Sequence, residues 1–114
     1  MISLFLVESG TKIVYEDRDR VMRVTIWDTP GLETDQNIVE TFCRGGHAAI
    51  ILYDITQRDS LRNAGKWLRK SPPNSFRALV GNKADLVSER EVSYEVLFCV
   101  CSQWFTSGVR SAVL

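Results

Sequence analysis

Two short runs of residues hold the side chains best suited to chemistry, and each follows a predicted strand. The first is the D-x-x-G turn Trp27-Asp28-Thr29-Pro30-Gly31, and the second is the N-K-x-D turn Asn82-Lys83-Ala84-Asp85. In open α/β sheets, ligands bind at the carboxyl ends of the strands, where both turns are expected to lie. These two turns are therefore the candidate functional site.

The first turn suits a metal-bound phosphate. Magnesium takes carboxylate and water oxygens, so Asp28 could hold the ion through a bound water. Gly31 has no Cβ, which lets its backbone N–H approach a γ-phosphate closely. Taken alone, D-x-x-G is also a common turn, because Asp and Gly are ordinary turn residues.

The second turn suits a guanine base. The Asp85 carboxylate can accept two N–H bonds from the guanine edge, and adenine offers no such donor pair. Asn82 can bond the other edge and tie the loop together, while the aliphatic stem of Lys83 can lie flat on the base. N-K-x-D alone could also be a plain turn. The order of the two motifs, each placed after a strand, favours a guanine-nucleotide site.

Hydrophobic periodicity predicts a hairpin followed by alternating strands and helices. Residues 12–15 and 21–27 form the hairpin around a charged turn at 16–20, with Met22, Val24 and Ile26 on one half-buried face. A helix is expected over residues 34–44, ending at Gly45-Gly46.

The next segments predict a parallel arrangement. The apolar run 48–53 is a strand covered on both faces. A helix follows over 59–70, with Leu61, Ala64 and Leu68 buried and with Thr56 or Asp59 as its cap. Residues 77–81 form another buried strand, and Ser93 opens a last helix. The predicted fold class is α/β, with a mostly parallel sheet, one antiparallel hairpin and helices on both faces.

The predicted domain organisation is a partial domain over residues 1–95 and a divergent tail over 96–114 that can form a helix. The run Val96–Cys101 is apolar on every side, whereas a surface helix should have a polar face. This run is therefore either deeply buried or badly placed.

Composition limits the possible partners. The chain has 114 residues, with 14 basic and 14 acidic side chains, so no charge footprint points to nucleic acid. No apolar run approaches the roughly 18 residues of a membrane span, which predicts a cytoplasmic protein. The odd count of three cysteines without C-x-x-C spacing predicts free thiols, and no terminal cysteine suggests a lipid anchor.

Three strings together resemble Ras-superfamily small GTPases, most closely the Rab branch: residues 27–33 (WDTPGLE), 43–56 (CRGGHAAIILYDIT) and 80–86 (VGNKADL). The resemblance covers roughly residues 12–95. It implies a partial P-loop-NTPase-type G domain that binds GTP or GDP with Mg²⁺ and acts as a GTP-hydrolysing switch in vesicle trafficking. It also implies effectors or regulators that bind the hairpin and residues 31–44.

The chain departs from the family pattern at the phosphate end of the site. The 114 residues contain no G-x-x-x-x-G-K-[ST] loop. Leu32 stands where the family has the glutamine that orients the attacking water, so no catalytic residue is assigned. The last strand, the last helix and the S-A-K loop of the family are not recognisable after Glu95.

These departures predict weak nucleotide binding and negligible hydrolysis. Four lost phosphate contacts at ~1.5–3 kcal/mol each remove about 6–12 kcal/mol, which is roughly four to nine decades of affinity. Two alternatives to an impaired GTPase are a non-catalytic module that binds GTPase partners and a truncated splice product.

Overall fold

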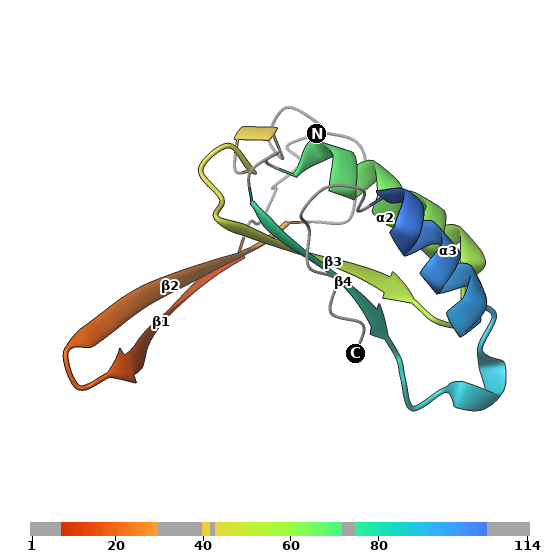
Figure 1. The fold of residues 1–114 in the computed structure, drawn as a ribbon, viewed down its shortest axis with the longest axis horizontal. Helices are drawn as coiled ribbons and strands as arrows, with labels where there is room; N and C mark the ends of the chain where they lie inside the picture. Colours follow the sequence, from red (N-terminus) through yellow and green to blue (C-terminus); the bar gives the residue numbers. More distant parts are fainter. Residues whose placement is uncertain (1–7, 30–39, 42, 72–74, 105–114) are drawn as a thin grey trace, which may run out of the picture. The chain divides into compact units, whose positions relative to one another are not determined.

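The computed structural model describes residues 8–29, 40, 41, 43–71 and 75–104. The chain divides into two compact units, Met1–Phe42 and Cys43–Leu114. The first unit contains strands β1 (Glu8–Asp17) and β2 (Arg20–Asp28) (Figure 1). The second contains β3 (Ala48–Asp54), α2 (Arg58–Lys70), β4 (Phe76–Asn82), the 3₁₀ helix η1 (Val87–Glu89) and α3 (Tyr94–Trp104). The predicted α/β class, with a parallel strand pair and an antiparallel hairpin, is confirmed.

The first unit is a long hairpin. β1 and β2 pair antiparallel from Glu8 opposite Asp28 to Asp17 opposite Arg20, so the charged turn lies where it was predicted. Of the predicted half-buried face, only Val24 is partly buried, whereas Met22 and Ile26 are 49% and 64% exposed, so the prediction is wrong for these two residues. Two strands by themselves offer no second layer against which an apolar face can be buried.

The helix predicted over residues 34–44 lies largely outside the described residues. Within that range, Glu40, Thr41 and Cys43 are helical, and a turn follows in which the N–H of Gly46 donates to the carbonyl of Cys43 over 3.1 Å. The described part of the segment therefore agrees with a helix that ends near the two glycines.

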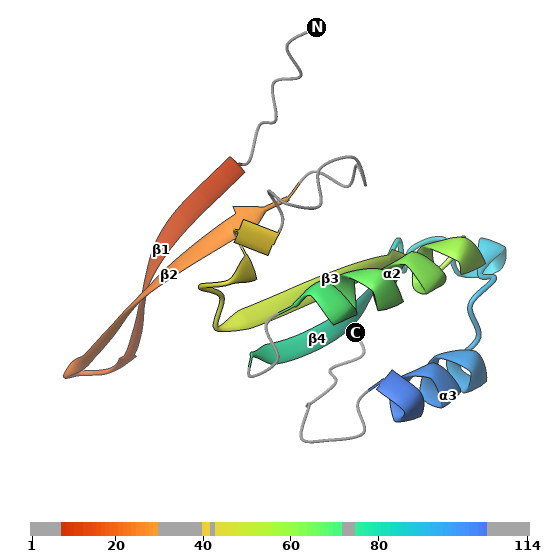
Figure 2. The same ribbon diagram turned by 90° about the horizontal axis from the view of Figure 1, so that it is seen from above.

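The second unit is built on a parallel strand pair. β3 and β4 run in register from Ala48 beside Phe76 to Asp54 beside Asn82. Parallel strands need a crossover, and α2 supplies it while running along β3 (Figure 2). The helix and both strands lie close to their predicted positions.

The core of this unit lies on one face of the strand pair. Ile51, Tyr53 and Leu79 are buried there against the stripe of α2 that was predicted, namely Leu61, Ala64 and Leu68. α3 packs on the same cluster through Leu97, which is 3% exposed. The apolar run Val96–Cys101 is therefore only partly buried, because Phe98, the residue after Leu97, is 79% exposed.

The opposite face of the strand pair is apolar, and its larger side chains are exposed, whereas Ala78 on that face is only 7% exposed. Ile50 and Leu52 are 70% and 59% exposed, and Phe76 is 49% exposed. The prediction that β3 is covered on both faces is wrong for the described residues, because α2 and α3 both pack on the face of Ile51 and Tyr53. Among the residues that the structure describes, no helix packs on the second face.

The start of α2 is capped from a distant segment. The N-cap position is Gln57, which makes no side-chain cap bond, so the predicted caps Thr56 and Asp59 are wrong. Instead the N–H of Arg58 donates to Oε2 of Glu91 over 3.1 Å. A carboxylate at a helix start also suits the helix dipole. This contact fastens the segment before α3 to the start of α2.

Two simple properties of the chain complete the description. Cys43, Cys99 and Cys101 are free thiols, as predicted. Among the described residues, no helix is both long enough and apolar enough to cross a membrane.

Gly81 gives a test of the packing under β4. A Cβ at this position would lie 2.8 Å from Oη of Tyr53 and 3.0 Å from Cγ2 of Ile55, and both of these side chains are buried. Overpacking of this kind costs roughly 1–3 kcal/mol, so we expect Gly81→Ala to lower the free energy of unfolding in urea by about that amount.

The matched control is Gly45→Ala, because a Cβ at Gly45 would have no atom within 4 Å. Its unfolding free energy should stay within about 0.5 kcal/mol of the parent chain. Equal effects of the two substitutions would contradict the packing described for β4.

Candidate functional site

The N-K-x-D turn begins at the carboxyl edge of the parallel strand pair. Asn82 ends β4 and is the register partner of Asp54, which ends β3. Oδ1 of Asn82 accepts a hydrogen bond from the N–H of Lys83 over 2.8 Å, and the N–H of Leu86 donates to the carbonyl of Lys83 over 2.9 Å. The side chain of Asn82 therefore bonds to the next residue of the turn, and the backbone bond from Leu86 to Lys83 spans the turn.

Lys83 adopts an unusual backbone conformation. Its φ of 63° makes it the one non-glycine residue with positive φ in the described part of the chain. A side-chain-bearing residue held in the left-handed region costs of order 1–3 kcal/mol and persists only where its surroundings enforce it. The bond from Asn82 holds one end of this residue, and its ammonium group is held separately.

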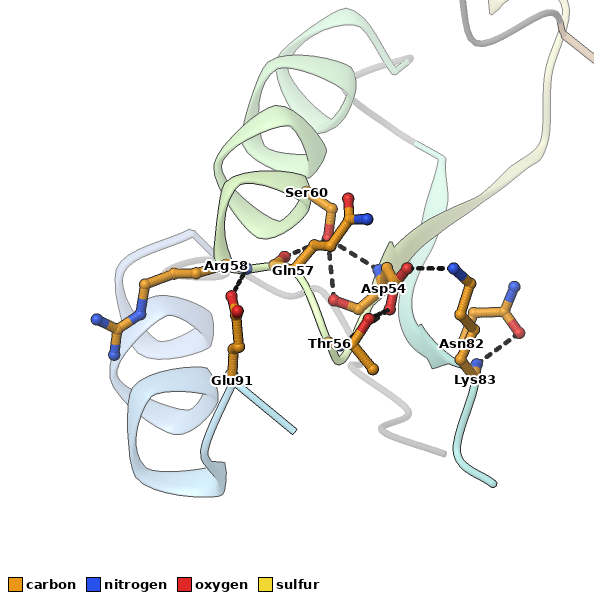
Figure 3. A network of polar contacts seen from close by, with 8 residues as sticks. All are labelled: Asp54, Thr56, Gln57, Arg58, Ser60, Asn82, Lys83 and Glu91. Atoms are coloured by element: carbon orange, nitrogen blue, oxygen red, sulfur yellow. Dashed lines mark hydrogen bonds and ion pairs between the residues drawn. The ribbon is translucent and has the colours of Figure 1, made fainter. Parts of the chain in front are cut away.

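That second contact is an ion pair with Asp54. Nζ of Lys83 lies 2.6 Å from Oδ2 of Asp54, whose side chain is only 14% exposed (Figure 3). Oδ1 of Asp54 accepts two further bonds, from the N–H and the hydroxyl of Thr56, over 2.9 and 2.7 Å. Both carboxylate oxygens of Asp54 are thus engaged.

These contacts shift the titration of both charged groups. The Lys83 bond, followed by the two Thr56 bonds, lowers the pKa of Asp54 from 3.8 to about 2. Conversely, the bond to Asp54 raises the pKa of Lys83. The pair is therefore fully charged across the physiological pH range.

The backbone of Asp54 is held as well. Its N–H donates to Oγ of Ser60 over 2.9 Å, and that hydroxyl lies 3.0 Å from the Asp54 carbonyl and 2.6 Å from the Gln57 carbonyl (Figure 3). Ser60 stands in the first turn of α2, so the end of β3 is fixed to the helix that follows it.

Sequence reasoning did not assign Asp54 or Ser60 to the site. One signal was available for Asp54, because it is the acidic residue that ends a continuously apolar strand at the same edge as Asn82. Ser60 had no such signal, since a serine in a first helical turn is ordinary.

The predicted site residues fall in different parts of the structure. Asn82, Lys83 and Asp85 share one exposed turn in the second unit. Asp28 is exposed at the end of β2 in the first unit, and Gly31 and Leu32 lie outside the described residues. Within the described ranges, no three acidic, histidine or cysteine side chains gather as metal ligands.

Comparison with known proteins agrees with the two motifs. The model of the Ras family matches residues 4–105. This chain belongs to the Ras family. It is 38% identical over 98 residues to the Ras-related protein RIC1 of Oryza sativa subsp. japonica, a match that covers 82% of this chain and 48% of RIC1.

Two further relatives of this Ras-family chain give similar values. The GTP-binding protein ypt1 of Schizosaccharomyces pombe is 38% identical over 86 residues, which is 72% of this chain and 42% of ypt1. The Ras-related protein RABD2a of Arabidopsis thaliana is 37% identical over 98 residues, which is 82% of this chain and 48% of RABD2a. The chain thus spans about half the length of these curated relatives.

The ion pair predicts a specific acid titration. We expect the side-chain carboxyl carbon of Asp54, followed by NMR, to titrate with a midpoint near 2. Lys83→Met should raise that midpoint toward 3.8, because it removes the largest cause of the shift while both Thr56 bonds remain. Since the pKa is depressed in the folded state, the stabilisation by Asp54 is complete above pH 3.8 and is lost as the pH falls through about 2.

Arg62→Met is the control for this titration. It removes the partner of an exposed ion pair on α2, in which Nη1 of Arg62 lies 3.1 Å from Oδ1 of Asp59. The midpoint of Asp54 should not change in this variant. A midpoint that also stays the same in Lys83→Met would show that the ion pair does not hold in solution.

Proposed function

We propose that this domain binds guanine nucleotides with Mg²⁺, more weakly than a Rab-like protein that carries a phosphate-binding loop. The observation that carries the proposal is the N-K-x-D turn, which the parallel strand pair presents at its carboxyl edge. Asn82 bonds to the backbone of Lys83, and Asp85 is exposed in the same turn, where its carboxylate can meet a base edge. The name of the fission yeast relative, a GTP-binding protein, supports the same ligand.

The proposed metal ligand is Asp28. Proteins hold Mg²⁺ through one or two carboxylates, with waters and substrate phosphates in the other positions. A single exposed carboxylate at the end of β2 fits that requirement. The ion would neutralise charge on the phosphates, and Gly31 would supply a backbone N–H to the γ-phosphate.

Hydrolysis is proposed to be negligible. Leu32 has neither a donor nor an acceptor with which to orient the attacking water. We propose a cytoplasmic, Rab-like role in vesicle trafficking on the strength of the family and of RABD2a among its relatives.

A second candidate function is protein binding without nucleotide. The hairpin exposes several large apolar side chains, among them Tyr15, Val21, Ile26 and Trp27, each more than half exposed. Exposed apolar patches of this kind mark interaction surfaces. The hairpin, with residues 31–44, would then contact effectors or regulators of GTPases.

A thermal melt with Mg²⁺ separates the two candidates. A ligand that binds only the folded state stabilises it by mass action, by about 1.4 kcal/mol at ten times its Kd. For a domain of this size, that raises Tm by roughly 5–11 °C. We expect millimolar GDP to raise Tm, ADP to leave it unchanged, and Asp85→Ala to abolish the GDP shift.

Asp59→Ala is the matched control, because it removes an exposed carboxylate of α2 whose ion-pair partner is Arg62, outside the turn. Its GDP shift should equal that of the parent chain. A cooperative melt that ignores GDP would favour the protein-binding function. A tight, stoichiometric GDP complex would contradict the proposed weak binding.

A further inference from the structure

We propose that Asp54 is the positioning residue of the guanine-reading turn, and that it acts by holding the ammonium group of Lys83. The aliphatic stem of Lys83 then forms a fixed platform for the base. This inference rests on the proposed function, since it assigns a residue to that site. It concerns a side chain of β3, outside the N-K-x-D motif itself.

The geometry holds the Lys83 side chain at both ends. At one end, the backbone of Lys83 is in the left-handed conformation and its N–H donates to Asn82. At the other end, Nζ lies 2.6 Å from Asp54. A free lysine stem samples many rotamers, and ordering it on binding costs entropy. The ion pair has already ordered this stem before any ligand arrives.

Asp54 is itself rigid enough to serve as an anchor. The Thr56 bonds occupy Oδ1 and leave Oδ2 for Lys83, while Ser60 holds the backbone N–H. Its pairing with Asn82 in the strand register places the anchor and the turn on adjacent strands. The contacts that hold the Asp54 carboxylate therefore also set the position of the Lys83 ammonium group, which pairs with it.

The ion pair between Lys83 and Asp54 also leaves the carboxylate of Asp85 available to bind a base. Asp85 and Glu89 both attract the charge of Lys83, but more weakly than Asp54 does. Because the ammonium group is committed to Asp54, the carboxylate of Asp85 is left outside the pair. One contact therefore orders the platform and leaves the base-reading carboxylate for the ligand.

The test is a double-mutant cycle on the full chain, with Mg·GDP titrated into four proteins by calorimetry: the parent, Asp54→Asn, Lys83→Met and the double variant. We expect each single variant to lose about tenfold in affinity, within the range seen for coupled pairs. The double variant should lose no more than the weaker-binding single variant, because both substitutions break the same contact. Multiplying losses would show that Asp54 does not act through Lys83.

A second measurement needs no nucleotide. In the ligand-free chain, Asp54→Asn should shift the backbone amide resonances of Lys83, Ala84 and Asp85, because the turn loses its anchor. The matched control is Asp59→Asn, the same chemical change in an exposed ion pair, which should leave those resonances in place.

The two measurements separate the possible failures. A parent chain that does not bind Mg·GDP overturns the proposed function, and the amide shifts then still decide whether Asp54 positions the turn. Unchanged amides in Asp54→Asn overturn the positioning role. A lower Tm with unchanged affinity for Mg·GDP would assign Asp54 a structural role only, and would also overturn the proposal.

Discussion

The parallel register of β3 and β4 is the constraint on which the candidate site depends. A shift of one residue in either strand would turn its side chains to the opposite face of the sheet. A shift of β3 would take Ile51 and Tyr53 out of the core and bring in Ile50 and Leu52, and a shift of β4 would take out Leu79. Burial under α2 and α3 thus selects the register, and the register brings Asp54 beside Asn82. The geometry of an exposed polar turn is set by apolar packing several residues away.

The same packing uses only one side of the strand pair. Close approach on that side depends on small residues, since Gly81 lies under Tyr53 and Ile55, and Gly65 of α2 lies against the ring of Trp104. On the other side Ala78 is buried, but the larger side chains Ile50, Leu52 and Phe76 stay largely exposed among the described residues.

Local patterns predicted the second unit well and non-local contacts poorly. The periodicity of apolar residues is visible in the sequence. It therefore predicted the buried stripe of α2, with Leu61, Ala64 and Leu68, and the positions of the apolar strands. The cap of α2 was not, because its carboxylate comes from Glu91, 33 residues away from Arg58. The Asp54–Lys83 pair depends on the strand register, which one sequence does not reveal. The predicted half-burial of β2 assumed a second apolar layer, and the pattern of one strand cannot show whether that layer exists. The roles of Asp28 and Gly31 stay predictions.

The contacts at the end of β3 have a consequence for how the loop after β4 can move. Lys83 is attached to Asp54 at one end of the loop, and at the other end the N–H groups of Glu91 and Val92 donate to the carbonyl of Ile55 over 2.9 and 3.1 Å. Asp54 and Ile55, which are consecutive, therefore hold the two ends of the segment 83–91 close together, so that the segment forms a closed loop. A short closed loop has few open states to enter, so its fluctuations are restrained without a core of its own. If the Lys83–Asp54 contact breaks, the far end of the segment stays attached, because Glu91 and Val92 still bond the carbonyl of Ile55 and Glu91 still accepts from the N–H of Arg58. The amide protons of Glu91 and Val92 are thus protected from exchange for as long as their bonds to the carbonyl of Ile55 hold.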